Sequence, residues 1–151
     1  MPRDLLTRPT GMPTPIAHHT SLLIYKLAGW INSELDHALS AEGLKTRDYS
    51  VLSVIQYKGP WSQQAVAQKL RIDKATMVAI VDTLERLGMV TRQRNREDRR
   101  NYDLIITQAG EQAIAEAERA VAELEEAVFA SLTPSQREEL HVSLSRLFLP
   151  A

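Results

Sequence analysis

The spacing of apolar residues along this chain changes abruptly after Gly88. Up to this glycine, apolar side chains recur roughly every three to four residues, which is the period of a helix that buries one face. Beyond it, the segments MVTRQ and YDLIIT alternate apolar and polar residues, which is typical of strands. The charged, turn-prone segment NREDRRN lies between them. The pattern predicts a β-hairpin that directly follows a helical region.

Two longer helices are expected before this region. Apolar residues recur at four-residue steps in an amphipathic helix over 16–39, which Gly43 ends. A second helix over 46–57 stops at the Gly-Pro breaker at 59–60. The preceding residues 1–15 contain four prolines and one glycine, a composition that predicts a flexible arm.

The segment directly before the hairpin predicts a pair of shorter helices. Ser62 is a good cap for the helix SQQAVAQKL, and Asp73 is a good cap for the helix KATMVAIVDTLERL. Gly88 stands where a helix commonly ends in the left-handed conformation. A turn separates the two helices, and together they predict a helix-turn-helix.

The helical period returns after the hairpin. One helix is expected from Gln108 onward, and a last helix has Thr133 as its cap and Pro134 at its first position. Residues 110–126 hold six glutamates and one arginine. We expect this acidic face to serve as a solubilising surface.

The hairpin concentrates positive charge. Residues 92–100 contain five arginines in nine positions, although the formal net charge of the chain is −1. Phosphates attract arginine whatever the DNA sequence, and a narrow minor groove attracts inserted arginine further. A cationic hairpin after a helix-turn-helix therefore indicates a DNA-binding wing. The alternative is a hairpin whose charges are only solvated.

The helix that follows Asp73 is expected to enter the DNA. With Met77, Ile80, Val81 and Leu84 facing the core, small and polar side chains turn outward at about 100° per residue. Asp82 also turns outward, where an ion pair with Arg86 is the alternative to a base contact by either residue. The predicted DNA contacts are Lys74, Ala75, Thr76, Val78, Ala79, Thr83 and Arg86 on this helix and Arg94, Arg96, Arg99 and Arg100 on the hairpin.

Two of these segments together resemble the MarR-type winged-helix transcriptional regulators. QQAVAQKLRIDKATMVAIVDTLERLGMV is similar to the helix-turn-helix of that family, and DRRNYDLIITQAG is similar to its wing. The resemblance covers nearly everything after the proline-rich arm. It implies a homodimer whose N- and C-terminal helices interlock. Each subunit would then present one winged helix to half of a pseudo-palindromic operator.

The wing motif implies roles for individual residues. By this match, Asp98 supports the wing by holding Arg100, which contacts the DNA backbone or the minor groove. Thr107 and Gly110 close the wing and start the next helix. Asn95 departs from the family pattern, because it replaces an acidic residue upstream in the wing.

The outward face of the helix also departs from the family. Ala75, Val78 and Ala79 occupy positions where the family often has polar or basic side chains. Apolar groups at these positions suit thymine methyl groups. Much of the specificity would then come from Thr76, Thr83 and DNA shape.

These elements predict a mainly α fold with a small β-hairpin wing. The architecture is a winged helix-turn-helix flanked by N- and C-terminal dimerisation helices. We expect a flexible arm over 1–15 and a single MarR-like domain over 16–151. Within it, the winged helix covers about 46–108 and the dimerisation helices cover about 16–42 and 109–149.

The composition disfavours other classes of protein. The chain has no cysteine, which excludes disulfides, Cys-ligated zinc and thiol redox switching. It shows no G-x-S-x-G motif and no Gly-rich phosphate loop, so we do not expect an enzyme. The four histidines lack the spacing of a metal site, and no cofactor is expected. Without a signal peptide or a long apolar run, the expected location is the cytoplasm.

A small molecule is the remaining candidate for a regulatory signal. The resemblance implies that a small aromatic or phenolic acid binds between the dimer helices and the winged helix. Lys26 or Arg47 would pair with its carboxylate, and aromatic side chains would supply apolar walls. The alternative is that these residues are core and rim of a ligand-independent repressor. The residues expected near the ligand are His19, Tyr25, Lys26, Trp30, Arg47, Tyr49 and Met77.

The predicted function is sequence-specific regulation of transcription. We expect a homodimeric repressor that a ligand releases from its operator. The alternative is a winged-helix interaction or assembly module that does not bind DNA. Steep dependence of binding on salt distinguishes the two, because contacts to phosphates release counterions.

Overall fold

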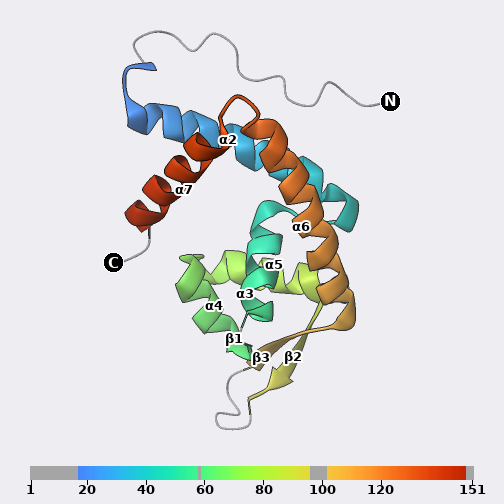
Figure 1. Ribbon diagram of the computed structural model, residues 1–151. Helices are drawn as coiled ribbons and strands as arrows, with labels where there is room; N and C mark the ends of the chain where they lie inside the picture. The colour runs from blue at the N-terminus through green and yellow to red at the C-terminus, as the bar shows by residue number, and fades with distance from the viewer. Residues whose placement is uncertain (1–16, 58, 96–101, 149–151) are drawn as a thin grey trace. The chain divides into compact units, whose positions relative to one another are not determined.

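The computed structural model shows a mainly helical chain with one small antiparallel sheet. The described residues are 17–57, 59–95 and 102–148. The elements in chain order are α2 (Thr20–Ala38), the 3-10 helix η1 (Leu39–Glu42), α3 (Thr46–Gln56), β1 (Trp61–Ser62), α4 (Gln63–Leu70), α5 (Lys74–Arg86), β2 (Val90–Arg94), β3 (Tyr102–Ile106), α6 (Gln108–Val128) and α7 (Pro134–Phe148) (Figure 1). The predicted fold class is confirmed.

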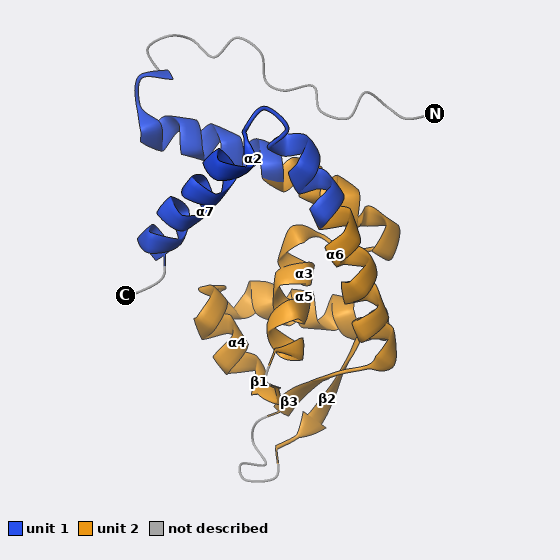
Figure 2. Ribbon diagram, in the orientation of Figure 1, with its two compact units in different colours: residues 1–31, 122–151 blue, residues 32–121 orange. Residues whose placement is uncertain are grey.

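The chain forms two compact units (Figure 2). One consists of Met1–Ile31 and Ala122–Ala151, and we call it the terminal-helix unit. The other is Asn32–Val121, and we call it the winged-helix unit. It contains α3, α4, α5 and all three strands.

Among the described residues, helix α2 begins later than the apolar pattern predicts. Helix α2 starts at Thr20, because the carbonyl oxygen of His19 accepts hydrogen bonds from the amides of Leu22 and Leu23 at 3.0 and 3.1 Å. His18 and His19 therefore precede α2. At the other end the chain continues as η1, which Gly43 ends in the left-handed conformation at φ 69°, as expected.

The sheet has a third strand that the sequence pattern did not predict. Strand β1 pairs antiparallel with β3, so that Trp61 lies opposite Leu104 and Ser62 opposite Asp103. The strand order is β1-β3-β2, which leaves β2 at an edge. A strand of two residues is too short to show a period of two, so only its tertiary pairing identifies it.

The predicted helix caps within the winged-helix unit are confirmed. The Ser62 hydroxyl accepts a hydrogen bond from the Ala65 amide at 3.1 Å, and Asp73 accepts one from the Thr76 amide at 3.0 Å. Gly88 adopts φ 71° after α5. These local signals fix where the two helices of the helix-turn-helix begin and where the second one ends.

One hydrophobic core holds the winged-helix unit together. The inward face of α5 is buried as predicted, with Met77, Ile80, Val81 and Leu84 all at 6% exposure or less. Leu52 of α3, Val66 of α4 and Leu104 of β3 belong to the same cluster. Helix α5 is therefore held by its apolar face, and its opposite face remains available to a partner.

Thr107 and Gly110 join the wing to α6. The Thr107 amide donates to the Met89 carbonyl oxygen at 3.0 Å, and its hydroxyl donates to the Gly88 carbonyl oxygen at 2.6 Å. The same hydroxyl oxygen accepts a hydrogen bond from the Gly110 amide at 3.1 Å. A Cβ atom at Gly110 would overlap the Met89 carbonyl oxygen and lie 2.8 Å from Ile106 Cγ1. Only glycine permits this close approach.

The terminal-helix unit leaves many apolar side chains exposed. Neither α2 nor α7 has a buried residue, and Phe148 is 85% exposed. The turn between α6 and α7 is fixed by Arg137, which donates to the Phe129 carbonyl oxygen at 3.1 Å and pairs with Glu126 at 2.7 Å. Well-defined helices with uncovered apolar faces are typical of a surface that associates with a partner.

We predict that Gly110→Ala lowers the free energy of unfolding by about 3 kcal/mol, because the added methyl group must displace backbone at Met89. Urea denaturation at fixed protein concentration measures the loss. Gly29→Ala is the control, since a methyl group there meets nothing within 4 Å and alanine favours a helix. Equal stability of Gly110→Ala and the wild type would contradict the close approach.

Candidate nucleic-acid interface

The outward face of α5 carries small side chains and Asp82 between two cations. Lys74 and Arg86, at the two ends of the helix, are exposed. Ala75, Val78 and Ala79 are exposed between them, with Val78 at 38%. The predicted division of α5 into a core face and an outward face is therefore present, and its small outward side chains allow close approach to a groove.

Two threonines flank this face, and both are half-buried. The Thr76 hydroxyl donates to Asp73 Oδ2 at 2.6 Å. The Thr83 hydroxyl donates to the Ala79 carbonyl oxygen at 3.0 Å. Both side chains are thus oriented by bonds within their own helix rather than left to rotate.

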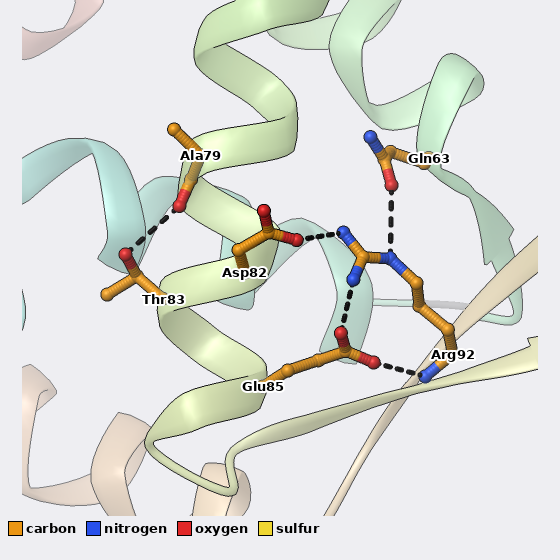
Figure 3. Close-up of polar contacts among 6 residues, drawn as sticks. All are labelled: Gln63, Ala79, Asp82, Thr83, Glu85 and Arg92. Carbon is orange, nitrogen blue, oxygen red and sulfur yellow. Dashed lines mark hydrogen bonds and ion pairs between the residues drawn. The ribbon is translucent and has the colours of Figure 1, made fainter.

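Arg92 of β2 connects the wing to α5 (Figure 3). Its guanidinium pairs with Asp82 at 2.7 Å and with Glu85, and its Nε donates to Gln63 Oε1 at 3.4 Å. Its backbone amide also donates to Glu85 at 3.0 Å. We call this group of four residues the Arg92 clamp, because it joins β2, α5 and the first residue of α4.

The clamp changes the interpretation of Asp82. The sequence spacing left two possibilities open for Asp82, a base contact or a surface ion pair with Arg86, four residues later on the same helix face. In the structure Asp82 pairs instead with Arg92, which approaches from the neighbouring strand and binds two carboxylates at once. A guanidinium held by two partners is more fixed than a flexible pair along a helix.

The base of the wing is braced by Asn95. Its side-chain amide donates to both carboxylate oxygens of Asp103 at 3.0 Å, across the β2–β3 hairpin. Asn95 therefore performs a bracing role although it replaces the acidic residue of the family pattern. Arg94, next to it, is exposed at the end of β2. The predicted wing residues Arg96, Asp98, Arg99 and Arg100 lie outside the described residues.

A groove beside α4 adds polar groups that the sequence reasoning missed. It has a volume of 680 Å³ and lies between α4, the start of α5 and β3. Its lining includes Gln64, Gln68, Arg71 and Tyr102 together with the predicted contact Lys74. Glutamine side chains on a short helix give no period or charge signal, so nothing in the sequence set them apart.

The residues predicted to surround a ligand divide between the two units. Lys26 and Trp30 line one hollow of 390 Å³ in the terminal-helix unit, together with apolar side chains of α2, α6 and α7. His19 and Tyr25 are exposed in the same unit, and Lys26 Nζ lies 5.9 Å from the centre of the Tyr25 ring. The predicted ligand residues in the winged-helix unit are Arg47, Tyr49 and Met77.

The three ligand candidates of the winged-helix unit have different surroundings. Arg47 is exposed and lines a hollow of 300 Å³ with Asp73. Tyr49 packs against the core, and Met77 is buried within it at 1% exposure. Among the residues that the structure describes, no three acidic or histidine side chains are close enough to hold a metal ion. In the same part of the chain, no helix is long and apolar enough to cross a membrane.

The fold and this site define a winged-helix DNA-binding protein. The outward face of α5, the clamped wing and the exposed cations form one surface of the winged-helix unit. The sequence model described as the MarR family matches residues 42–101, which span this surface.

Comparison with known proteins gives the same family. A putative transcriptional regulatory protein for the hcr operon of Thauera aromatica is 34% identical over 72% of this chain and 66% of its own length. A MarR-family transcriptional regulator from Rhodococcus sp. RHA1 has a TM-score of 0.83 at 24% identity, covering 92% of this chain and 99% of that one. The structure of CouR from Rhodococcus jostii RHA1, bound to p-coumaroyl-CoA, has a TM-score of 0.78 at 23% identity, covering 92% of this chain and 98% of that one. The chain belongs to the MarR family, whose members are DNA-binding transcriptional regulators and not enzymes.

We predict that Arg92→Met lowers the free energy of unfolding by about 1 kcal/mol, because it leaves Asp82 and Glu85 as neighbouring, partly exposed carboxylates without their shared cation. Urea denaturation measures the change. Arg86→Met removes the same charge from an exposed position on α5 and is expected to cost less than about 0.5 kcal/mol. Equal costs for the two variants would show that the clamp contributes nothing to stability.

Proposed function

We propose that this protein is a homodimeric, sequence-specific transcriptional repressor that binds a pseudo-palindromic operator. The Arg92 clamp is the observation that carries the proposal, because it fixes the wing against the recognition helix α5. In this proposal the helix enters a major groove, and the wing reaches the adjacent backbone or minor groove. The expected place of action is the cytoplasm.

The proposed DNA contacts come from both parts of this surface. On α5 they are the exposed and flanking residues Lys74, Ala75, Thr76, Val78, Ala79, Thr83 and Arg86. On the wing they are the exposed Arg94 and, outside the described residues, Arg96, Arg99 and Arg100 with Asp98 as support. Arg92 is not among them, because its guanidinium is already held by the clamp.

The exposed helices support a homodimer. Members of this family bind DNA and act as dimers. In this chain α2 exposes Leu22, Leu23, Ile24 and Leu27 at 39–42%, a contiguous apolar face of the kind that marks a protein interface. A two-fold dimer would cover this face with its own copy and place two copies of α5 on two half-sites.

An assembly module without DNA binding is the second candidate. The exposed helices of the terminal-helix unit fit that function equally well. The clamp favours DNA binding, because it fixes the wing beside a helix whose ends carry the exposed cations Lys74 and Arg86. Association through the terminal helices alone does not require this arrangement. Binding to duplex DNA decides between the two.

We predict that the protein binds duplex DNA with an affinity that falls steeply as salt concentration rises. Arg94→Ala should weaken binding by a similar factor at every duplex sequence and reduce the salt slope by about one, since it removes a phosphate contact. Fluorescence anisotropy over a salt series measures both effects. Arg119→Ala is the control, because it removes the same charge from α6, where Arg119 pairs with Glu116 at 3.0 Å. Absence of binding at low salt would favour the assembly module.

We further propose that a small aromatic or phenolic acid releases the repressor from DNA. Lys26 and Trp30 border the same apolar hollow of the terminal-helix unit. This hollow therefore combines a cation, which suits a carboxylate, with an aromatic side chain, which suits an aromatic ring. The structure of CouR contains p-coumaroyl-CoA, and this ligand carries a phenolic acyl group. His19 and Tyr25 of the same unit are the other proposed neighbours of this ligand. Arg47, Tyr49 and Met77 belong to the winged-helix unit and stay predictions from the sequence.

We predict that an active aromatic acid quenches or shifts the fluorescence of Trp30 and lowers DNA affinity. A tenfold loss of affinity requires a coupling free energy of about 1.4 kcal/mol, and DNA must weaken the ligand by the same factor. The titration uses Trp61→Phe, so that Trp30 alone reports. Lys26→Met is the matched variant, which should weaken carboxylates but not neutral phenols. If bound compounds leave DNA affinity unchanged, the protein is a ligand-independent repressor.

A further inference from the structure

The middle of the recognition helix presents methyl groups where a regulator commonly presents hydrogen-bond donors. Ala75, Val78 and Ala79 are exposed between the terminal cations Lys74 and Arg86. None of these three side chains has a polar atom. Any polar contact at the centre of α5 must therefore come from the residues that flank them.

Thr76 is the first of these flanking residues, and its hydroxyl proton is already used. The hydroxyl donates to Asp73 Oδ2 at 2.6 Å, while Asp73 Oδ1 accepts from the Thr76 amide at 3.0 Å. These two hydrogen bonds, the hydroxyl bond first, hold the pKa of Asp73 below its ordinary value, so the carboxylate stays ionised and only accepts. Since a hydroxyl has one proton, Thr76 offers only lone pairs to the groove.

The hydroxyl group of Thr83 also offers only lone pairs to the groove. Its hydroxyl donates to the Ala79 carbonyl oxygen at 3.0 Å, one turn earlier in α5 (Figure 3). A carbonyl oxygen only accepts, so the direction of this bond is fixed as well. Asp82, which is exposed on the same face one turn after Val78, is also an acceptor and is bound to Arg92. From residue 75 to residue 83, the outward groups are methyls and acceptors.

This combination matches one kind of base pair in the major groove. An A·T pair presents the thymine C5-methyl group and the adenine N6 amino donor. Guanine presents only the acceptors N7 and O6 there, and cytosine has a donor but no methyl group. An acceptor that faces guanine would oppose another acceptor, which leaves both without a partner.

We propose that the centre of α5 selects A·T base pairs, with Ala75, Val78 and Ala79 contacting thymine methyl groups and the Asp73-oriented hydroxyl of Thr76 accepting from adenine N6. This inference rests on the proposed function and assigns the specificity within it. Thr76 is the third residue of α5, within the N-terminal part of a recognition helix that contacts base edges. Asp73 sets the specificity without touching DNA.

The preference itself is tested by selecting bound duplexes from a random pool. A·T pairs should be enriched at adjacent positions in each half-site. Replacing one such pair by G·C should weaken binding by about tenfold, a typical loss for one unfavourable pair. Replacing its thymine by deoxyuridine removes only the methyl group and should cause a smaller loss. Enrichment of G·C pairs at the positions in contact with α5 would overturn the proposal.

Asp73→Asn tests the role of the hydroxyl direction. Asparagine caps a helix as well as aspartate, so its amide oxygen keeps the bond from the Thr76 amide. Its amide nitrogen replaces Oδ2 and donates to the Thr76 hydroxyl, which is then free to donate outward. The preference for A over G at one position of the half-site should fall by about fivefold or more. Thr76→Val removes the acceptor and should reduce the same preference.

The ratio of affinities for two duplexes that differ only by A or G at this position is independent of any general effect of charge on DNA binding. Removing the Asp73 carboxylate should strengthen binding to every duplex, and this factor cancels in the ratio. If the ratio is unchanged in Asp73→Asn, with thermal unfolding near that of the wild type, the proposal is wrong although DNA binding stands. If no duplex binds the wild type at low salt, the proposed function fails instead.

Discussion

The geometry of the candidate interface depends on Arg92. Strand β2 lies at the edge of the sheet, so one side of its backbone has no neighbouring strand. The amide of Arg92 donates instead to Glu85 of α5, and its guanidinium pairs with Glu85 and Asp82. Side chains, rather than the sheet ladder, therefore fix the wing against the recognition helix. The cluster of arginines in the sequence thus combines two roles, with Arg92 structural and Arg94 exposed.

A second junction holds the wing from the opposite strand. Thr107 follows β3 and bonds to the carbonyl oxygens of Gly88 and Met89, which lie between α5 and β2. Gly110 permits α6 to begin against the same backbone. Both strands of the hairpin are thus attached to the end of α5, one through Arg92 and one through Thr107. A wing held at both strands can position its exposed cation with little loss of conformational freedom on binding.

Local signals in the sequence predicted most of the fold. The caps Ser62 and Asp73 and the left-handed Gly88 each depend on neighbours within a few residues, so their positions could be read directly. The two-residue strand β1 was missed because its only signal is its pairing with β3. The start of α2 at Thr20 was also missed, since amphipathic spacing does not mark a first hydrogen bond.

The contacts of the candidate site were harder to predict than the helix that presents them. The outward face of α5 followed from its period, but the partner of Asp82 did not. Arg92 is ten residues from Asp82 and 29 from Gln63, so its bonds depend on how the hairpin folds back. The hydroxyl directions of Thr76 and Thr83 also required atomic positions, because the sequence shows only that both can donate and accept.

The exchange rate of the Arg92 amide hydrogen tests the clamp most directly, because this amide donates to a side chain instead of a neighbouring strand. The account predicts slow exchange in the wild type and fast exchange in Glu85→Ala, measured by nuclear magnetic resonance, together with weaker binding to duplex DNA. Two results would contradict the claim that the bond between Arg92 and Glu85 positions the wing for DNA. One is fast exchange of the Arg92 amide in the wild type, and the other is full DNA affinity in Glu85→Ala after protection is lost.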